Sequence, residues 1–259
     1  MKIVCTGHKG FLGSHLLPIL KGHLVIGADV VTGQSIFGEY IENKIKHCDA
    51  VIHLAAMTNV EDSKKNPRPY YLVNVFGTAR VAELCIKYNK KLIYPSTLHI
   101  FKRESSPYAD SKAVAESIVQ VASKLIPTVI LRLYNVFGKG MNNNSGSIIN
   151  LFLKNKEIEV YGNGQVTRDF IHARDVVSIM KDSLKPKWDG QTVDVGTGRF
   201  ISIGNLAKIF AEFRGLKVKY LRNKKQLSWP TANTEKLREL YRKELKTNIR
   251  EDIRKLCQN

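Results

Sequence analysis

The chain has 259 residues, 43% of them hydrophobic, so it can bury the core of one α/β domain with a small appended lobe. Its apolar stretches are shorter than the ~20 residues that span a bilayer, so we expect no membrane segment. Because a strand-like segment follows Met1 directly, we also expect no signal peptide.

The formal net charge is +18, and 14 Lys and Arg against 5 Asp and Glu place +9 of it from Arg214 onward. Aromatic residues are not interleaved with the basic runs, and no nucleic-acid motif is present. The charge predicts a solvated surface and no nucleic-acid partner. Attraction of an anionic substrate and binding of a polyanion remain the second and third interpretations.

The cysteines are scattered and form no Cys-x-x-Cys pair: Cys5, Cys48, Cys85 and Cys257. This usage is typical of reduced thiols rather than of disulfides or a zinc site. We expect a cytoplasmic protein without a bound metal.

In the first half, short apolar runs alternate with amphipathic stretches, which is typical of a parallel sheet covered by helices on both faces. We expect strands near 2–6, 23–28, 50–54, 91–95 and 128–132. The intervening segments predict helices near 11–21, 36–46, 67–88 and 108–125.

After Gly138 the pattern changes to a polar, asparagine-rich loop from Gly140 to Gly146 and then to shorter elements. These are a helix near 147–154, a strand near 158–161, helices near 173–184 and 203–213, and a charged helical tail from about 234. No repeat or low-complexity linker separates the halves, so the second half reads as a lobe packed on the first.

A glycine-rich turn, Gly7-His8-Lys9-Gly10-Phe11-Leu12-Gly13, follows the first strand and opens the first helix. In such a turn one glycine permits the tight bend, another lets the backbone approach a pyrophosphate, and the third allows close packing of helix and strand. The free N–H groups at the helix start, including those of Phe11 and Leu12, then meet the phosphate charge. The alternative is a glycine-rich turn without a ligand.

Asp29 ends the second strand, where its carboxylate can accept hydrogen bonds from the adenosine ribose hydroxyls. The same charge repels a 2′-phosphate, and Val30 and Val31 offer no arginine to bind one. Asp29 therefore predicts NAD rather than NADP, the alternative being an aspartate that only caps the following turn.

Tyr108 and Lys112 are four residues apart in a predicted helix, so both project from one face. A free tyrosine has a pKa of ~10, and a nearby ammonium together with the positive nicotinamide ring favours its phenolate. The pair predicts proton transfer at a carbon that carries oxygen, with an ordinary tyrosine of an amphipathic helix as the alternative.

These motifs, taken with four more, resemble the extended short-chain dehydrogenase/reductases, and more narrowly the nucleotide-sugar epimerase/dehydratase family with its UDP-glucose 4-epimerase-like members. The further motifs are His53-Leu54-Ala55-Ala56, Asn74-Val75-Phe76-Gly77-Thr78, Leu131-Arg132-Leu133-Tyr134-Asn135-Val136-Phe137-Gly138 and Arg168-Asp169-Phe170-Ile171-His172. The resemblance runs in register from residue 2 to about 210 and thins beyond 214, although residues 229–236 loosely resemble a late substrate-binding segment.

The resemblance implies an α/β fold: a Rossmann-type doubly wound parallel sheet with a small C-terminal substrate-binding lobe. We expect the NAD-binding domain over residues 1–138 and the lobe mainly over residues 139–259, with segments of the second half returning to the Rossmann core.

The resemblance also implies roles for individual residues. Leu54, Ala55 and Ala56 match the strand end that lines the nicotinamide side of the cofactor. Thr97 matches the catalytic Ser/Thr, although the adjacent Ser96 is an alternative. Tyr108 and Lys112 match the catalytic pair, which also contacts the cofactor.

In the second half, Asn135 and Arg168 match residues that bind the diphosphate or the nucleotide part of the substrate. Asn74 matches a position that supports the site. The alternative for Asn135 and Arg168 is that a buried asparagine or arginine organises loops.

The chain departs from the family pattern after Asp29. Only 20 residues separate Asp29 from Ala50, and much of that stretch is predicted to be one helix. The family normally has another strand there, ending in an aspartate that contacts adenine. We expect this strand to be missing or vestigial and the adenine to be contacted differently.

Two further departures concern the sugar pocket. Only six residues separate Phe101 from Tyr108, which predicts a more open rim. Leu98 and His99 stand where the 4,6-dehydratases have the Asp-Glu pair that follows the catalytic threonine. Water elimination needs an acid and a base, and His99 could serve as one of them but Leu98 as neither, which disfavours a dehydratase. His99 is expected to bind or position the substrate, with a proton shuttle as the alternative.

The leading hypothesis is an NAD-dependent nucleotide-sugar epimerase that inverts carbon 4 of a nucleoside-diphosphate sugar. A keto-sugar-nucleotide reductase or a dehydratase is the enzymatic alternative, and an NAD-sensing binding protein the non-enzymatic one. The family usually forms homodimers through two helices, here near 67–88 and 108–125. The helix near 108–125 carries more apolar residues than one core-facing stripe needs: Ala113, Val114, Ile118, Val121 and Ala122. The alternative is that these residues simply bury against the sheet.

Overall fold

A computed structural model describes residues 1–101, 106–141, 147–221 and 230–258. The chain divides into two compact units. The first comprises Met1–Leu133 and Val177–Val193, and the second comprises Tyr134–Val176 and Asp194–Asn259. Parts of three predicted features lie outside the described residues: the shortened loop at 102–105, the asparagine-rich loop at 142–146, and residue 229 of the late segment.

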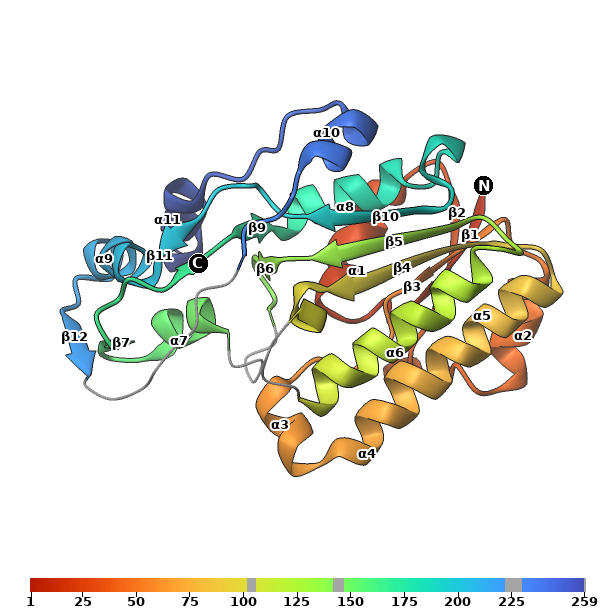
Figure 1. The fold of residues 1–259 in the computed structure, drawn as a ribbon, viewed down its shortest axis with the longest axis horizontal. Coiled ribbons are helices and arrows are strands. Elements are labelled where there is room, and N and C mark those ends of the chain that lie inside the picture. The colour runs from red at the N-terminus through yellow and green to blue at the C-terminus, as the bar shows by residue number, and fades with distance from the viewer. Residues whose placement is uncertain (102–105, 142–146, 222–229, 259) are drawn as a thin grey trace. The chain divides into compact units, whose positions relative to one another are not determined.

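The first unit is built on a six-stranded sheet with the order β10-β5-β4-β3-β1-β2 (Figure 1). Its strands are β1 (Lys2–Thr6), β2 (Leu24–Ala28), β3 (Ala50–His53), β4 (Lys91–Thr97), β5 (Thr128–Leu133) and β10 (Gln191–Val195). Pairing is parallel between β1 and β2, β1 and β3, β3 and β4, and β4 and β5. The strand order reverses beside β1, as in a Rossmann-type doubly wound sheet, and such a reversal opens a crevice at the carboxyl ends of the strands.

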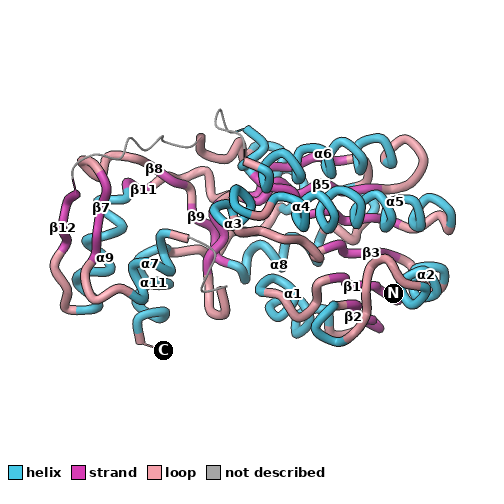
Figure 2. The backbone as a smooth tube through the Cα atoms, turned by 90° about the horizontal axis from the view of Figure 1, so that it is seen from below, coloured by secondary structure: helices cyan, strands magenta, loops and turns pink. Residues whose placement is uncertain are grey.

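Helices cover both faces of this sheet, which confirms the predicted fold class (Figure 2). On one face lie α2 (Glu39–Lys46), α5 (Gly77–Lys87) and α6 (Pro107–Ala122). The other face carries α1 (Phe11–Leu16), continued by a 3₁₀ turn (Leu17–Leu20), and α8 (Ala173–Asp182) from Val177 onward. Because strand side chains alternate between faces, Val4, Val51, Leu92, Tyr94 and Ile130 share one core with α2, α5 and α6.

The segment after Asp29 contains a 3₁₀ turn (Val30–Thr32) and α2, and the structure describes no strand between residues 30 and 48. The predicted loss of a strand is therefore confirmed. Ile41 and Ile45 of α2 are fully buried in the core that Val81 and Cys85 of α5 also enter. The helix thus contributes apolar surface to the α5 and α6 face of the sheet.

The predicted helix over 67–88 is three consecutive pieces: α4 (Pro67–Tyr70), a π-helical turn (Tyr71–Phe76) and α5. A short helix that the sequence did not predict, α3 (Val60–Lys65), precedes them. The predicted helix near 108–125 is α6, and Ser106 caps it by accepting a hydrogen bond from the Ala109 N–H. This cap fixes the start of the helix that carries Tyr108 and Lys112.

The second unit, in the part that the structure describes, consists of short paired strands and four helices. β6 (Asn135–Phe137) pairs with β9 (Phe170–His172), β7 (Ile158–Tyr161) with β12 (Val218–Leu221), and β8 (Thr167–Arg168) with β11 (Ile201–Ser202). The helices are α7 (Ile148–Lys154), α9 (Ile203–Arg214), α10 (Glu235–Tyr241) and α11 (Ile249–Cys257). The helical tail predicted from about 234 is therefore two helices.

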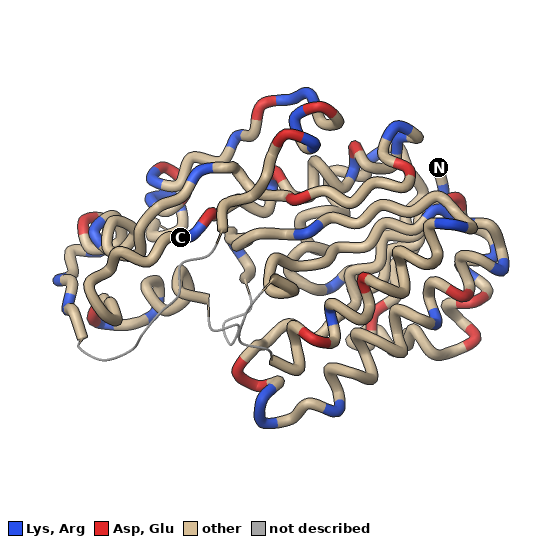
Figure 3. The backbone as a smooth tube through the Cα atoms, viewed as in Figure 1, with Lys and Arg blue, Asp and Glu red and all other residues tan. Residues whose placement is uncertain are grey.

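Basic residues are found along helices and loops of both units (Figure 3). Several pair with carboxylates of neighbouring elements, among them Arg80 with Glu42 and Arg174 with Asp252. Among the described residues, no helix is both long enough and apolar enough to cross a membrane.

Candidate active site

The glycine turn between β1 and α1 has a separate requirement at each glycine. Gly7 has a φ of +67°, and a Cβ there would lie 2.6 Å from the Ala55 nitrogen. A Cβ on Gly13 would lie 2.6 Å from the His8 carbonyl carbon. A side chain at either position would therefore collide with backbone, so these glycines serve the tight turn and the close packing of helix and strand.

Gly10 is different, because a Cβ there would have only the Gly7 carbonyl oxygen, at 3.2 Å, within 4 Å. It is exposed and takes the N-cap position of α1, where it has no side chain to bond the first-turn N–H groups of Phe11 and Leu12. The open space and the free donors suit a phosphate group. This turn therefore fits the pyrophosphate of a dinucleotide.

Asp29 lies at the end of β2, is 9% exposed, and holds the glycine turn and the following turn together. Its Oδ2 accepts the Lys9 N–H at 2.9 Å, and its Oδ1 accepts the Val31 N–H at 3.0 Å. The aspartate therefore does cap the turn, which was the alternative to a ribose contact. Each oxygen can still accept one more hydrogen bond, so capping and ribose binding are compatible.

A buried polar network positions the strand end that carries Leu54, Ala55 and Ala56. Thr6 Oγ1 accepts the Ala55 N–H at 3.2 Å and lies 2.7 Å from His53 Nδ1. His53 Nε2 lies 3.2 Å from the Thr78 hydroxyl of α5. Burial lowers the pKa of His53 to about 3, so its ring is neutral and joins β1, β3 and α5 without a charge.

Asn74 connects the segment after this strand end to the helix that carries Tyr108 and Lys112. In the π-helical turn its Oδ1 accepts the Met57 N–H at 2.8 Å, and its Nδ2 donates to the Met57 carbonyl at 3.0 Å and to Ser111 Oγ at 2.9 Å. Ser111 in turn donates to the Tyr108 carbonyl. Asn74 is 1% exposed, and this geometry is compatible with the supporting role that the resemblance implies.

Thr97 and Ser96, at the carboxyl end of β4, have different partners. The Ser96 hydroxyl donates to Glu116 Oε2. Thr97 Oγ1 accepts the His99 N–H at 3.2 Å, which leaves its own proton available for donation. Thr97 also forms a side-chain hydrogen bond with Tyr108, which lowers the pKa of the Tyr108 phenol.

Tyr108 and Lys112 are both buried, at 7% and 5% exposure. Burial raises the pKa of the Tyr108 phenol, and the hydrogen bond with Thr97 opposes that rise. Burial lowers the pKa of Lys112 to about 7, and the charge of Glu116 one turn further along α6 opposes that fall. Lys112 Nζ donates to the Pro95 carbonyl at 2.7 Å. The chain therefore provides a buried phenol, a hydroxyl donor and an amine that titrates near neutrality.

His99 is half-buried beside this group, and its ring lies edge-on to that of Tyr108 with the centroids 5.5 Å apart. The structure therefore brings His99, Thr97 and Tyr108 together. A histidine here could contact the same substrate atoms as the phenol.

Asn135 and Arg168 belong to the second unit, in β6 and β8. The Asn135 amide donates to the Asp169 carbonyl at 2.8 Å, and the Arg168 guanidinium donates to the Thr167 carbonyl at 2.9 Å. Burial lowers the pKa of Arg168 to about 10, so it remains a cation at neutral pH.

The fully buried carboxylate of Asp169 organises the rest of this region. It accepts the N–H groups of Thr197, Gly198 and Ala232 at 2.9 to 3.2 Å and the Thr197 hydroxyl at 2.6 Å. The sequence alone indicates Asp169 only as part of its motif and predicts no role for it. Its hydrogen-bond partners lie up to 63 residues away along the chain, so no local pattern indicates them.

Comparison with known proteins gives one family. The model of the NAD dependent epimerase/dehydratase family matches residues 3–196. A putative UDP-glucose 4-epimerase of Methanocaldococcus jannaschii is 30% identical, and the match covers 82% of this chain and 83% of that protein. The dTDP-D-glucose 4,6-dehydratase of Dictyostelium discoideum is 29% identical over 80% of this chain, which spans 61% of the dehydratase.

Solved structures share the fold. A UDP-N-acetylglucosamine 4-epimerase from Methanobrevibacter ruminantium superposes with a TM-score of 0.89 at 23% identity, covering 99% of this chain and 97% of its own. A UDP-glucose 4-epimerase from Thermotoga maritima has a TM-score of 0.87 at 24% identity, covering 100% and 98%.

Proposed function

This chain belongs to the NAD-dependent epimerase/dehydratase family, and on that premise we propose that it is a nucleotide-sugar epimerase that inverts carbon 4 of a nucleoside-diphosphate sugar. Bound NAD supplies the hydride acceptor and donor. The observation that best supports the proposal is the buried group of Thr97, Tyr108 and Lys112, which combines a hydroxyl donor, a phenol and an amine.

In this proposal Tyr108 accepts the proton of the sugar 4-hydroxyl and later returns it. The Thr97 hydroxyl donates to the same oxygen, which stabilises the charge that develops there. The ammonium form of Lys112 favours the phenolate of Tyr108, whose pKa burial alone would raise. His99, edge-on to Tyr108, positions the sugar.

Asn135 and Arg168 are proposed to bind the diphosphate or the nucleotide part of the substrate. Arg168 is suited to this because it is partly buried and still cationic, and a guanidinium binds phosphate oxygens with two parallel hydrogen bonds. The partner of the enzyme is therefore a nucleoside-diphosphate sugar.

Asp29 is proposed to bind the adenosine ribose, which makes NAD the preferred cofactor over NADP. Its carboxylate is already held by two N–H groups, so it can face a ribose diol without moving. Dissociation constants of NAD and NADP at one salt concentration test this assignment, and equal or tighter binding of NADP contradicts it.

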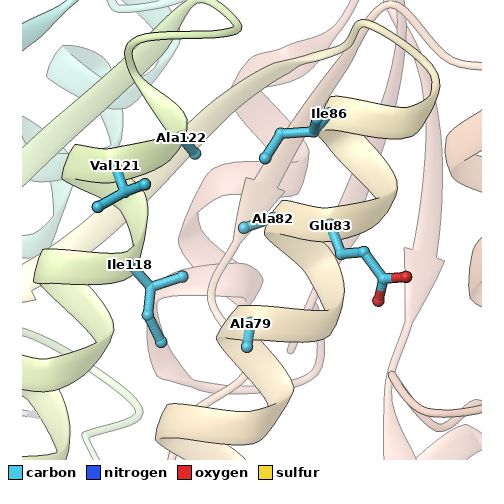
Figure 4. A pocket seen from close by; sticks show the side chains of 7 residues that line it. All are labelled: Ala79, Ala82, Glu83, Ile86, Ile118, Val121 and Ala122. Atoms are coloured by element: carbon cyan, nitrogen blue, oxygen red, sulfur yellow. The ribbon is translucent and has the colours of Figure 1, made fainter.

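We also propose a homodimer formed through α5 and α6. An apolar groove lies between them, lined by Ala79, Ala82, Glu83, Ile86, Ile118, Val121 and Ala122 (Figure 4). Val121 is 62% exposed and Leu125, just beyond α6, is 65% exposed. Apolar residues at this exposure argue against the alternative that α6 simply buries its whole apolar surface on the sheet.

A cytoplasmic location remains part of the proposal. Its support is the state of Cys5, Cys48, Cys85 and Cys257, all of which are free thiols in the structure.

The deciding experiment supplies a panel of nucleoside-diphosphate sugars with catalytic NAD and follows both NADH absorbance and sugar configuration. An epimerase brings two 4-epimers to equilibrium without accumulating NADH. Stoichiometric formation or use of NADH would make the protein an oxidoreductase, and loss of water from the sugar would make it a dehydratase. Binding of NAD without turnover of any sugar would favour the NAD-sensing protein.

A further inference from the structure

Tyr94 lies directly under the ammonium group of Lys112. Lys112 Nζ is 4.1 Å from the centroid of the Tyr94 ring, and the same nitrogen donates to the carbonyl of the next residue, Pro95, at 2.7 Å. Tyr94 is 1% exposed and Lys112 is 5% exposed, so water screens this contact very little. A cation over the face of an aromatic ring is attracted by the ring quadrupole, and most strongly when both are desolvated.

The hydroxyl of Tyr94 does not explain why a tyrosine occupies this position. Tyr94 Oη is buried and makes no hydrogen bond of ordinary length and angle with the described residues, although the Thr78 hydroxyl is near enough to act on its pKa. A buried hydroxyl without a good partner costs stability, so a phenylalanine would fill the same space at less cost. Burial raises the pKa of Tyr94 well above its usual value, so the phenol carries no charge of its own. The aromatic face is therefore the part of Tyr94 with a favourable interaction at this point.

The other groups that face Lys112 provide little balancing charge. From β3, His53 is neutral at pH 7 because burial lowers its pKa to about 3. From α6, the protonated phenol of Tyr108 contributes no charge. The carboxylate of Glu116, on the same helix, raises the pKa of Lys112. Glu116 is itself engaged by Arg132 of β5, at 2.6 and 2.9 Å, and by the Ser96 hydroxyl.

We propose that Tyr94 is a positioning residue whose ring face holds Lys112 at the Pro95 carbonyl and stabilises its ammonium form. Its importance for turnover rests on the proposed function, because the ammonium is the form that favours the Tyr108 phenolate. The electrostatic contact itself does not depend on which sugar is the substrate.

Two consequences distinguish this role from simple packing. Burial already brings the pKa of Lys112 down to about 7, so a further small loss of stabilisation changes its charge at neutral pH. Removing the ring face lowers that pKa, and the decline of turnover on the alkaline side then begins at lower pH. A residue that only filled space would change stability and leave the titration where it is.

The test measures the pKa of Lys112 directly, by NMR of protein labelled at the lysine ε-carbon, with Lys112→Arg used to assign the resonance. Tyr94→Phe keeps the ring and is expected to retain the parent value. Tyr94→Leu removes the ring and is expected to lower the pKa by about one unit. Phe152→Leu, a buried aromatic substitution in the second unit, controls for general loosening.

If Tyr94→Leu does not fold, pentafluorophenylalanine at position 94 keeps the shape of a ring and reverses its quadrupole, so the same fall in pKa is expected. An unchanged Lys112 pKa in either ring-altering variant would overturn the proposal. So would an equal fall in Tyr94→Phe or in Phe152→Leu.

The pH profile of kcat/KM for the epimerase reaction supplies the second measurement. Its alkaline limb should move to lower pH in Tyr94→Leu and return to the parent position in Tyr94→Phe. If no nucleotide sugar is turned over, the proposed function fails while the NMR titration still decides the role of Tyr94.

Discussion

At Tyr108, burial and a local hydrogen bond change the pKa of the phenol in opposite directions. Burial raises the pKa of its phenol, and the bond with Thr97 lowers it. The phenol therefore needs a nearby positive charge to act as a base near neutrality, and Lys112 on the same helix face can supply one.

Tyr108→Phe keeps the ring and removes the hydroxyl that we propose as the proton acceptor. We expect kcat to fall by about 10²–10⁴, with substrate affinity little changed, because the lost interaction acts mainly in the transition state. Steady-state kinetics together with calorimetric binding of the substrate measure the two effects. Activity at the parent level would remove Tyr108 from the catalytic assignment.

Ser96 and Thr97 are adjacent in sequence, but their partners predict different variants. Thr97→Ala removes the available donor and should lower kcat by about 10². Ser96→Ala leaves Glu116 Oε2 without its hydroxyl partner and should lower the free energy of unfolding by about 1–3 kcal/mol, with a smaller effect on kcat. Urea unfolding and kinetics on both variants check this, and a larger kinetic loss in Ser96→Ala would reverse the assignment.

Among the elements, α2 is held to α5 by charge as well as by its apolar side. Glu42 accepts hydrogen bonds from Lys87 at 2.7 Å, Tyr88 at 2.9 Å and Arg80 at 2.6 Å. The bonds from Lys87 and then Tyr88 lower the pKa of Glu42 from 4.5 to about 2. This carboxylate therefore fixes the helix that follows the missing strand.

Because the folded-state pKa of Glu42 lies below its ordinary value, its contribution to stability is complete above pH 4.5 and is lost as the pH falls towards 2. Glu42→Gln should be less stable than the parent at pH 7, and the difference should shrink between pH 4.5 and 2. Urea midpoints across this range measure it.

Glu61→Gln is the matched control for Glu42→Gln, because Glu61 pairs with Lys64 in α3 through two exposed side chains and such pairs contribute little to stability. A difference between Glu42→Gln and the parent that stays constant from pH 7 to 2 would contradict the role of the charge.

The five strands from β1 to β5 could be predicted because each is a short apolar run between helical stretches. The sixth strand of the sheet, β10, was missed. It begins at Gln191, lies at one edge of the sheet, and keeps three of its residues partly exposed, so it lacks a continuous apolar run. The π-helical turn could not be predicted either, because residues 67–88 read as one continuous helix. Within this turn Asn74 bonds Met57 and Ser111, and such contacts between separate segments leave no local pattern in the sequence.

The candidate site divides in the same way. Glycine spacing and the interval between Tyr108 and Lys112 are local patterns, so the sequence alone indicated them. The contact of Thr6 with His53 joins segments far apart in the chain and follows from the parallel register of β1 and β3. The contact of Tyr94 with Lys112 follows from the packing of α6 against β4.

For the whole molecule, the exposed apolar residues of α5 and α6 predict association. Val121→Glu places a carboxylate in the proposed contact, where burial of an unpaired charge costs several kcal/mol, so the variant should be monomeric at micromolar concentration. Light scattering and sedimentation of parent and variant measure the change. Phe200→Glu, which alters a 66% exposed residue of the second unit, should remain dimeric. A parent protein that is already a monomer would contradict the proposed dimer. A Val121→Glu variant that stays a dimer would show that the contact lies elsewhere.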